Sequence, residues 1–290
     1  MNSRRAWAAW VVVCLVWGTT YLAIRIALET IPPLLMASFR WIAAGALLIG
    51  ALAARGERLP PRRSWGSLAV LGVLLLGFGN GGVVWAERTV PSGLTAVLVA
   101  MSPFWMVGLE ALMADGEPLT PRRVVGLLVG FGGILALVWP EHGLGAAGRE
   151  FLGGVVAAQL ACIGWAIGST YARRHAREDN VLAAAAFQML FGGLFLFAAG
   201  LVHGEWRDLV FNPRTSAALA YLIFFGAIAG FSAYAYALKH LPIATVSLYA
   251  YINPVIAVVL GTLVLDEPFN TRTAISAAVV LVGVGMVRET

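Results

Sequence analysis

The sequence predicts an all-α integral membrane protein of ten transmembrane helices, arranged as two inverted-topology repeats of five helices. Three observations predict it: an apolar composition, ten apolar segments of spanning length, and an internal match between the two halves. The 290 residues are 60% hydrophobic and only 12% charged, and their mean hydropathy is +0.82. A soluble domain carries about 25% charged residues, so a chain this apolar needs the bilayer as its solvent.

The first half of the chain contains five predicted spans. Each is close to the roughly 20 apolar residues that a bilayer core about 30 Å thick requires. Transmembrane strands would alternate in polarity over about ten residues, and these segments do not, so helices are predicted. Prolines stand at the segment edges, where they start or stop helices. The five spans are Trp7–Leu28, Leu34–Ala53, Trp65–Ala86, Ser92–Met113 and Arg123–Trp139.

The second half repeats this plan, and its short loops leave no room for a soluble domain. Proline again marks the edges, at Pro213, Pro242 and Pro268. The five spans are Phe151–Tyr171, Val181–Val202, Ser216–Leu238, Ile243–Leu265 and Ala274–Val287.

The distribution of lysine and arginine predicts the orientation. With the N-terminus in the cytoplasm, 13 of the 20 basic residues fall in cytoplasmic segments and 5 in outer ones. Cytoplasmic loops are enriched in basic residues, so both termini are predicted to be cytoplasmic, in a multi-pass protein of a bacterial inner membrane. The apolar run from Trp7 is too long for a cleavable signal peptide.

Charges, cysteines and histidines argue against three other kinds of protein. The net charge of +5 comes from basic residues in short loops, so no nucleic-acid partner is predicted. Cys14 and Cys162 lie inside apolar segments without CxxC spacing, so neither disulfides nor a metal site are predicted. The four histidines lie at or beyond span ends, outside any HExxH motif. We therefore predict no catalytic residue, no cofactor and no enzymatic activity.

The two halves match in sequence. Pro103 and Pro254 are 151 residues apart, and Gly18-Thr19-Thr20-Tyr21 precedes Gly168-Ser169-Thr170-Tyr171 by 150. The predicted repeats cover residues 6–140 and 150–288. Because each holds five spans, an odd number, the second must enter the membrane from the opposite side. Inverted repeats of this kind are typical of secondary transporters, whose substrate site lies near the midplane where the repeats meet.

Several motifs carry a family resemblance over nearly the whole chain. They are Trp17-Gly18-Thr19-Thr20-Tyr21, Pro32-Pro33, Phe39-Arg40, Gly79-Asn80-Gly81, Ala86-Glu87, Pro91-Ser92-Gly93, Ser102-Pro103, Gly116-Glu117-Pro118-Leu119-Thr120, Asn253-Pro254 and Asp266-Glu267-Pro268. In these the chain resembles the EamA family of the drug/metabolite transporter superfamily. The resemblance implies ten helices in two repeats and a central cavity lined mainly by the first, third, fourth, sixth, eighth and ninth. It also implies export of amino acids or related metabolites, as in the bacterial exporters of aromatic amino acids.

Pro103 and Pro254 lie in the middle of the fourth and ninth predicted spans. A proline removes one helical hydrogen bond and frees the carbonyl four residues earlier, here those of Val99 and Ala250. A free carbonyl at membrane depth requires a protein interior or a wet cavity. We expect the two prolines to bend symmetry-related helices along the transport path, which is compatible with static kinks that serve packing.

A central cavity is predicted from polar and aromatic residues inside the spans. Polar side chains facing lipid are costly, so they are expected to face inward. The alternative is that the hydroxyls and amides join helices to one another. The predicted substrate-binding residues are Trp17, Tyr21, Asn80, Trp85, Ser102, Trp165, Ser247 and Tyr251.

Two charged residues are candidates for substrate binding or gating. Arg40 lies about two turns into its span and could bind a carboxylate, although long arginine side chains also snorkel to the interface or form structural pairs. Glu87 lies at the outer end of the third span. No carboxylate lies at the midplane, which favours facilitated diffusion or exchange over proton-linked transport.

The remaining aromatic and glycine residues are assigned to anchoring and packing. Trp7, Trp10, Trp41 and Trp139 are predicted to be interfacial anchors. Glycines in the fifth and tenth spans, such as Gly133 and Gly283, follow a small-residue pattern that packs helices within one protomer or between protomers. The predicted partners are a small-molecule substrate and the lipid bilayer, with a monomer or weak homo-oligomer expected.

Two transport functions and one enzymatic function compete. Export of amino acids or related metabolites by alternating access follows from the inverted repeat and the paired prolines. Export of cationic aromatic drugs would use cation–π contacts, but it requires a deep acidic residue that the sequence does not show. A membrane-embedded enzyme would need a nucleophile–base pair or metal ligands, which are not seen.

Overall fold

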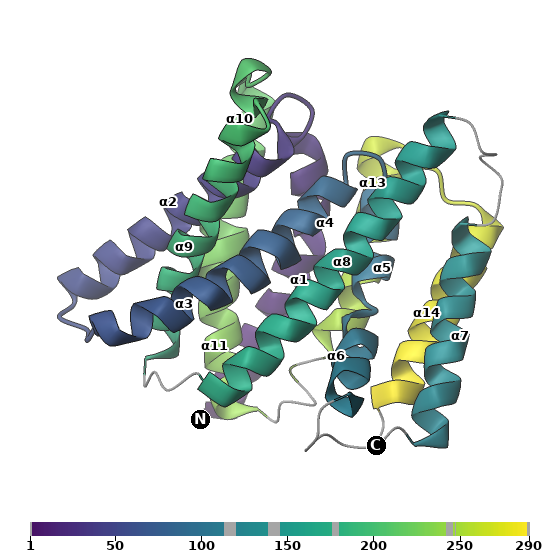
Figure 1. Cartoon of the computed structure of the whole chain (residues 1–290), viewed down its shortest axis with the longest axis horizontal. Helices are drawn as coiled ribbons and strands as arrows, with labels where there is room; N and C mark the ends of the chain where they lie inside the picture. Colours follow the sequence, from purple (N-terminus) through teal and green to yellow (C-terminus); the bar gives the residue numbers. More distant parts are fainter. Residues whose placement is uncertain are drawn as a thin grey trace.

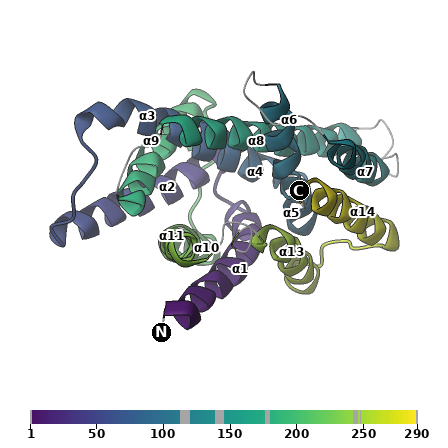
Figure 2. The ribbon, with the colours of Figure 1, turned by 90° about the horizontal axis from the view of Figure 1, so that it is seen from below.

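The structure is a computed structural model that describes residues 2–112, 120–138, 146–175, 180–241, 246 and 248–288. Within these ranges it is helical, without β-strands. The long helices lie side by side, with α2, α3 and α9 at one side of the molecule and α7 and α14 at the other (Figures 1 and 2).

Among the described residues, each predicted span overlaps one helix or one run of helices. The helices of the first half are α1 (Asn2–Ala27), α2 (Pro33–Ala54), α3 (Trp65–Leu71), η2 (Gly72–Asn80), α4 (Gly81–Ala86), α5 (Ser92–Val99), α6 (Ser102–Ala111) and α7 (Pro121–Val138). Those of the second half are α8 (Ala146–His175), α9 (Val181–Val202), α10 (Pro213–Tyr221), η4 (Leu222–Ala229), α11 (Gly230–His240), α13 (Tyr249–Leu265) and α14 (Thr271–Arg288). Short 3₁₀ turns cover Arg62–Ser64 (η1) and Glu205–Arg207 (η3).

Local sequence explains where these helices start and stop. Pro33 and Pro213 stand at the first turn of α2 and α10, where a missing N–H costs nothing. A capping box opens α10: the Asn212 side chain accepts from the Thr215 backbone, and the Thr215 hydroxyl bonds back to the Asn212 backbone. Asp266 ends α13 with a φ of 51°, in the left-handed region.

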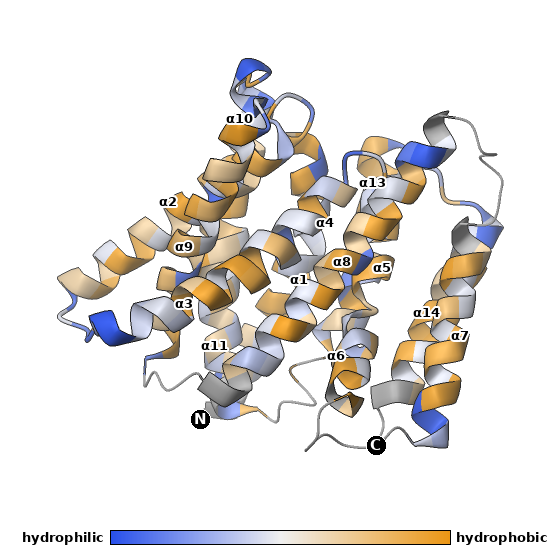
Figure 3. Cartoon of the chain, in the orientation of Figure 1, coloured by the Kyte–Doolittle hydropathy of each residue, from blue (hydrophilic) through white to orange (hydrophobic). Residues whose placement is uncertain are grey.

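The helices have the length and composition of membrane spans. Among the described residues, seven helices or helical runs are long and apolar enough to cross a bilayer. They are Arg4–Ala27, Pro33–Ala54, Arg62–Ala86, Ser92–Leu109, Gly148–Ala172, Val181–Val202 and Pro213–Ala237. Tyr249–Leu265 and Thr271–Met286 are shorter apolar helices. Hydrophilic residues gather at helix ends and connecting segments (Figure 3). The predicted class, an all-α integral membrane protein, is confirmed.

Two helical runs contain a π-helical stretch in the middle. One is η2, between α3 and α4, and the other is η4, between α10 and α11. π-Helical turns are rare and frequently lie at functional sites, because they leave backbone groups out of the regular ladder. They therefore direct attention to the residues around η2 and η4.

Helix packing divides the interior into two main clusters. The first gathers buried side chains of α1, α2, η2, α4, α9, α10 and η4. The second gathers those of α4, α5, α6, α7, α8 and α14. Helices α7 and α14 approach each other closely because a glycine of each helix faces the backbone of the other. A Cβ at Gly283 would lie 2.6 Å from the backbone nitrogen of Gly130, and one at Gly133 would lie 3.0 Å from that of Val280. The expected packing role of these glycines is confirmed within the protomer.

Candidate functional site

The fourth predicted span is broken into α5 and α6. Pro103 is the second residue of α6, and its ring nitrogen cannot donate to the carbonyl of Val99. That oxygen instead accepts from the Ser102 hydroxyl at 2.7 Å and lies 3.8 Å from the Cys162 sulfur of α8. The structure thus places Ser102 beside the break, where its hydroxyl supplies a donor that the helix lacks.

The ninth predicted span carries Pro254 inside α13. The buried Asn253 lies next to it. When the Asn253 amide is oriented with its nitrogen toward the carbonyl oxygens of Cys14 and Tyr249, it donates to both at 3.1 Å. Tyr251 packs against the second hydrophobic cluster. The predicted binding residue Ser247 lies outside the described residues.

Trp17 of α1 is the centre of an aromatic cluster. Its ring centroid lies 5.0–5.3 Å from those of Phe231, Tyr234 and Tyr249. Its indole N–H donates to the carbonyl oxygen of Gly226 in η4 at 3.1 Å. This bond satisfies a backbone group of the π-helical stretch and fixes the Trp17 ring at the junction of α1, η4, α11 and α13.

Asn80, the last residue of η2, accepts a hydrogen bond from the indole N–H of Trp41 at 3.0 Å. Trp41 is only 1% exposed, so its assignment as an interfacial anchor is wrong. The indole lies inward because Asn80 and the Phe231 ring, 5.9 Å away, offer it partners there. Trp165 of α8 lies against Gly79, next to Asn80.

Arg40 of α2 is buried, with 3% of its surface exposed, so the snorkelling alternative is wrong. Its guanidinium lies over the Trp41 ring, 4.4 Å from the centroid. Within the described structure, neither its Nε nor its Nη1 atom has a hydrogen-bond partner. The guanidinium is therefore held by a ring face while two of its donors stay unused.

Glu87, directly after the third span, is completely buried, and neither carboxylate oxygen has a donor among the described residues. Arg25 donates to its backbone carbonyl instead. Burial raises the pKa of the Glu87 carboxyl well above its ordinary value. The positive charges of Arg25 and Arg40 lower this pKa, and the negative charge of Glu267 raises it. Tyr21 of α1 also interacts electrostatically with this carboxylate. Glu87 and Arg40, both predicted site residues, are thus buried with charged atoms that lack hydrogen-bond partners among the described residues.

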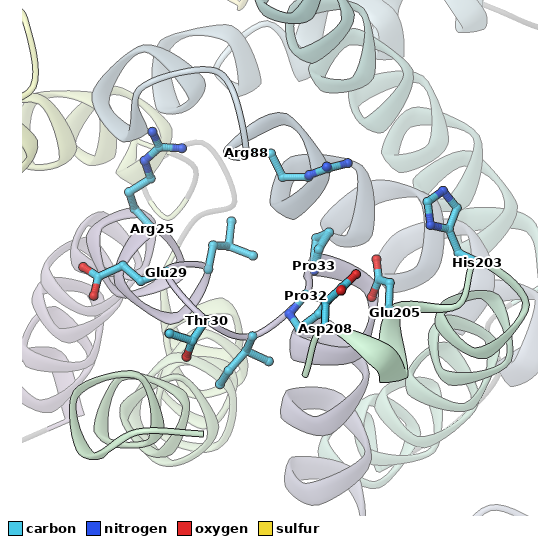
Figure 4. Close-up of a pocket in the computed structure, with 11 residues that line it drawn as sticks. Arg25, Glu29, Thr30, Pro32, Pro33, Arg88, His203, Glu205 and Asp208 are labelled. Atoms are coloured by element: carbon cyan, nitrogen blue, oxygen red, sulfur yellow. The ribbon is translucent and has the colours of Figure 1, made fainter. Parts of the chain in front are cut away.

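A cavity of about 570 Å³ opens where α1 ends and α2 begins. We call it the vestibule. Arg25 and Arg88 line one side, and Glu205 lies beside Asp208 on another, near His203 (Figure 4). In the described ranges, no three His, Cys, Asp or Glu side chains converge as metal ligands would. The mixture of charges suits a polar, hydrated entrance rather than an apolar binding pocket.

Trp85 of α4 contacts two residues that line this vestibule, His203 and Arg88, rather than the cluster around Trp17. Its ring packs edge-on against His203 with centroids 5.4 Å apart, and the Arg88 guanidinium lies 4.4 Å from its centroid. The predicted cavity residues therefore fall into separate groups.

Carboxylates from the second half cap two helices of the first half at this end. Glu267 accepts from the Ser92 backbone at 2.8 Å and from its hydroxyl at 2.9 Å, at the start of α5. Glu205 accepts from the Leu34 and Leu35 backbone at 3.3 and 2.9 Å, at the start of α2. A carboxylate at a helix N-terminus satisfies free N–H groups and complements the helix dipole.

Sequence reasoning missed these contacts. It noted Glu267 only as part of the Asp266-Glu267-Pro268 motif, and gave no role to Glu205. The motif held the one available signal, since Glu117-Pro118 and Glu267-Pro268 recur 150 residues apart. Which helix start accepts the carboxylate depends on the tertiary arrangement.

Interrupted helices and unpaired buried charges in an apolar helical bundle are features of a membrane transporter. The chain belongs to the EamA-like transporter family, which matches residues 5–139 and 152–288. The family expected from the sequence motifs is therefore confirmed.

Named relatives agree with this class, and a solved structure shares the fold. The chain is 38% identical to the uncharacterized inner membrane transporter YedA of Escherichia coli K12, over 86% of this chain and 79% of YedA. It is 28% identical to protein PecM of Dickeya dadantii, over 87% of this chain and 82% of PecM. A solved crystal structure with 22% identity shares the fold, with a TM-score of 0.66 over 99% of this chain and 98% of the other.

Proposed function

We propose that the protein exports aromatic or neutral amino acids, or closely related small metabolites, by alternating access. The observation that carries this proposal is a pair of π-helical stretches at matching positions in the two halves, since η2 begins at Gly72 and η4 at Leu222, 150 residues apart. Pro103 and Pro254 are 151 residues apart, the first at the start of α6 and the second inside α13. Interrupted helices at membrane depth line a wet path or are buried in protein, and their pairing favours a path between two repeats.

The proposed architecture is ten spans in two inverted repeats, residues 6–140 and 150–288. Helix packing supports it because contacts recur with the halves exchanged. α2 packs against η4, as α9 packs against η2. α1 packs against α10 and α11, as α8 packs against α3 and α4. A two-fold relation in which each helix exchanges with its counterpart accounts for these pairs.

We place the protein in a bacterial inner membrane with both termini in the cytoplasm. The excess of basic residues in the predicted cytoplasmic loops supports this orientation. The name of YedA, an inner membrane transporter, supports the location.

Amino acids suit the interior around Arg40 and Trp17. A buried guanidinium favours a carboxylate, and the rings around Trp17 give an apolar wall for a side chain. The proposal is tested in liposomes that contain the purified protein, with labelled phenylalanine and threonine as probes. We expect saturable flux that excess unlabelled substrate inhibits, that protein-free liposomes lack, and that persists without a pH gradient. If neither amino acid moves nor competes, the amino-acid assignment is wrong.

Export of cationic aromatic compounds is the second candidate. The buried carboxyl of Glu87 favours it, because this function requires an enclosed acidic residue. The sequence alone had not indicated one. Cells that express the protein are challenged with ethidium or another cationic dye. Resistance that depends on Glu87, without amino-acid flux in liposomes, would favour this candidate over the first.

A further inference from the structure

Two cavities meet at a pair of arginines. The vestibule, of about 570 Å³, and a second cavity of about 440 Å³ share two lining residues, Arg25 of α1 and Arg88 after α4. The second cavity is otherwise lined mainly by α5, α8, α13 and α14. A small molecule bound at the two arginines can therefore extend into both spaces.

Both guanidinium groups have donors to offer such a molecule. The Arg88 guanidinium lies 4.4 Å from the centroid of the Trp85 ring, and among the described residues no carboxylate pairs with it. Arg25 gives a hydrogen bond to the backbone carbonyl of Glu87, and a guanidinium carries five donors. Two guanidinium groups on the wall of one cavity favour a carboxylate, which can accept paired N–H donors.

The acidic residues of the vestibule lie on the other side of this pair (Figure 4). Glu205 accepts from the backbone at the start of α2, and Glu29 pairs with Arg214 at 3.1 Å. Asp208 is exposed, and within the described ranges its carboxylate has neither a hydrogen bond nor an ion pair. Their negative charge favours an ammonium group on the vestibule side and disfavours a second anionic group there.

The second cavity adds a short apolar wall, to which Leu94, Val97 and Val258 contribute. On three helices the lining covers about one turn: residues 93–97 of α5, 258–262 of α13 and 273–277 of α14. One turn rises about 5.4 Å. A wall of this depth matches the side chain of an amino acid, whereas the acyl chain of a phospholipid would extend far beyond it.

Contacts between the two halves hold this wall in place. A Cβ at Gly93 would lie 2.6 Å from the Cα atom of Val258, so α5 and α13 meet at their backbones. Glu267 lines the second cavity too, but its carboxylate accepts from the backbone and the hydroxyl of Ser92. It therefore stabilises the start of α5 and is not free to bind an ammonium group.

We propose that the junction of the two cavities binds an α-amino acid with an apolar side chain. Arg25 and Arg88 bind its carboxylate, and its ammonium group lies on the vestibule side, toward Asp208. The side chain packs on Leu94 and Val97 in the second cavity. This assignment rests on the proposed function and adds a binding site at the vestibule end of the transport path. A merely hydrated entrance would not need an apolar cavity joined to the same two arginines.

Protection of an engineered cysteine reads this site locally. Thr262→Cys places a thiol in the second cavity at a half-buried position, and the native Cys14 and Cys162 are buried. The full-length protein in detergent is treated with a small methanethiosulfonate reagent in the presence of phenylalanine, 3-phenylpropionate or phenethylamine. Glu57→Cys, exposed in the connection after α2, controls for effects of the probes on the reagent.

We expect phenylalanine to slow the labelling of Thr262→Cys at least fivefold and to leave Glu57→Cys unchanged. 3-Phenylpropionate should need a severalfold higher concentration, because the vestibule acids repel an unbalanced anion, and phenethylamine should not protect. With Arg88→Gln added, the phenylalanine concentration for half-protection should rise tenfold or more. Asp208→Asn should bring 3-phenylpropionate closer to phenylalanine.

The matched control for the arginine is Arg207→Gln. Arg207 is exposed and stacks on the adjacent Trp206 at 5.3 Å, much as Arg88 stacks on Trp85, but it lines neither cavity. Its half-protection concentration should stay within twofold of the wild type. Arg88→Lys should recover part of the loss, because it restores the charge without the planar fork, and a disturbed fold would not be rescued in this way.

Equal protection with and without Arg88→Gln would overturn the site. So would protection that Arg40→Gln removes and Arg88→Gln leaves, since the ligand would then lie in the interior. Protection by phosphatidylglycerol in mixed micelles, with none by phenylalanine, would show a lipid site instead. Phenylalanine protection without amino-acid flux in liposomes would support the site and contradict the proposed export, whereas flux without protection would do the reverse.

Discussion

At the scale of single residues, Trp41 links the polar groups of the interior. One face of its indole carries Arg40, its N–H bonds Asn80, and its edge meets Phe231. An indole can do this because it combines a large apolar ring with one directed donor. Three side chains from α2, η2 and α11 are thus fixed relative to one another.

The enclosed carboxyl of Glu87 predicts a pH dependence of stability. A carboxyl whose pKa is raised on folding stabilises the protein fully below its ordinary value, 4.5, and that contribution disappears as the pH rises through the raised value. We expect the unfolding temperature of ligand-free wild type in detergent to fall over this range, and Glu87→Gln to flatten the fall.

The control is Glu57→Gln, which removes an exposed carboxylate in the connection after α2. Its unfolding temperature should follow the wild-type profile. If Glu87→Gln and the wild type have parallel profiles, Glu87 does not change its protonation on unfolding.

At the scale of helices, α7 and α14 pack through glycines that face each other's backbone. Gly133 and Gly283, 150 residues apart, each lie against the partner helix. Small residues let helices approach closely in a bilayer, where packing replaces the hydrophobic effect as the main attraction. This reciprocal contact is expected of repeats related by two-fold symmetry.

Substitution of these glycines separates packing from helix propensity. A Cβ at Gly283 would lie 2.6 Å from backbone, so Gly283→Ala should destabilise the protein by about 1–3 kcal/mol. Gly285→Ala, in the same helix with nothing within 4 Å, should stabilise it by about 0.5–1 kcal/mol. Thermal unfolding in detergent measures both, and equal effects of the two substitutions would contradict the close contact.

At the scale of the whole molecule, one end is joined by contacts between the halves. Glu205 and Glu267 cap α2 and α5 there, and the vestibule lies beside them. A second cavity of about 440 Å³ shares Arg25 and Arg88 with the vestibule and is also lined by Glu267. In the proposed orientation this end faces away from the cytoplasm.

Cysteine labelling tests that orientation. The two variants are Asp208→Cys and Glu57→Cys. Asp208 follows the seventh span, Glu57 follows the second, and both positions are exposed. A membrane-impermeant maleimide should label position 208 in intact spheroplasts and position 57 only in inverted vesicles. Cys14 and Cys162 are 3% and 1% exposed, so their background should be low. Labelling of both positions from one side would contradict the proposed topology.

The sequence by itself determined the class of the protein. Apolar runs and proline boundaries depend on local composition and chain length, so the helical segments could be predicted directly. The family was predicted from the resemblance of the sequence motifs. Arg40 and Glu87 could also be chosen as candidates from the sequence, since charges within or at the ends of apolar segments are costly. The sequence did not determine where the end of each side chain lies or which residues it contacts.

The tertiary structure decided which residues meet. Trp41 was predicted from the sequence to be an interfacial anchor, and only its packing against η2 and α11 makes it an interior residue bonded to Asn80. Trp85 matched the other aromatic candidates in sequence but lies at the vestibule. Helix periodicity shows which side chains share a face, whereas the neighbour of that face is set by packing between helices distant in the chain. For that physical reason only the tertiary structure shows that Arg40 and Glu87 are buried with charged atoms that lack partners among the described residues.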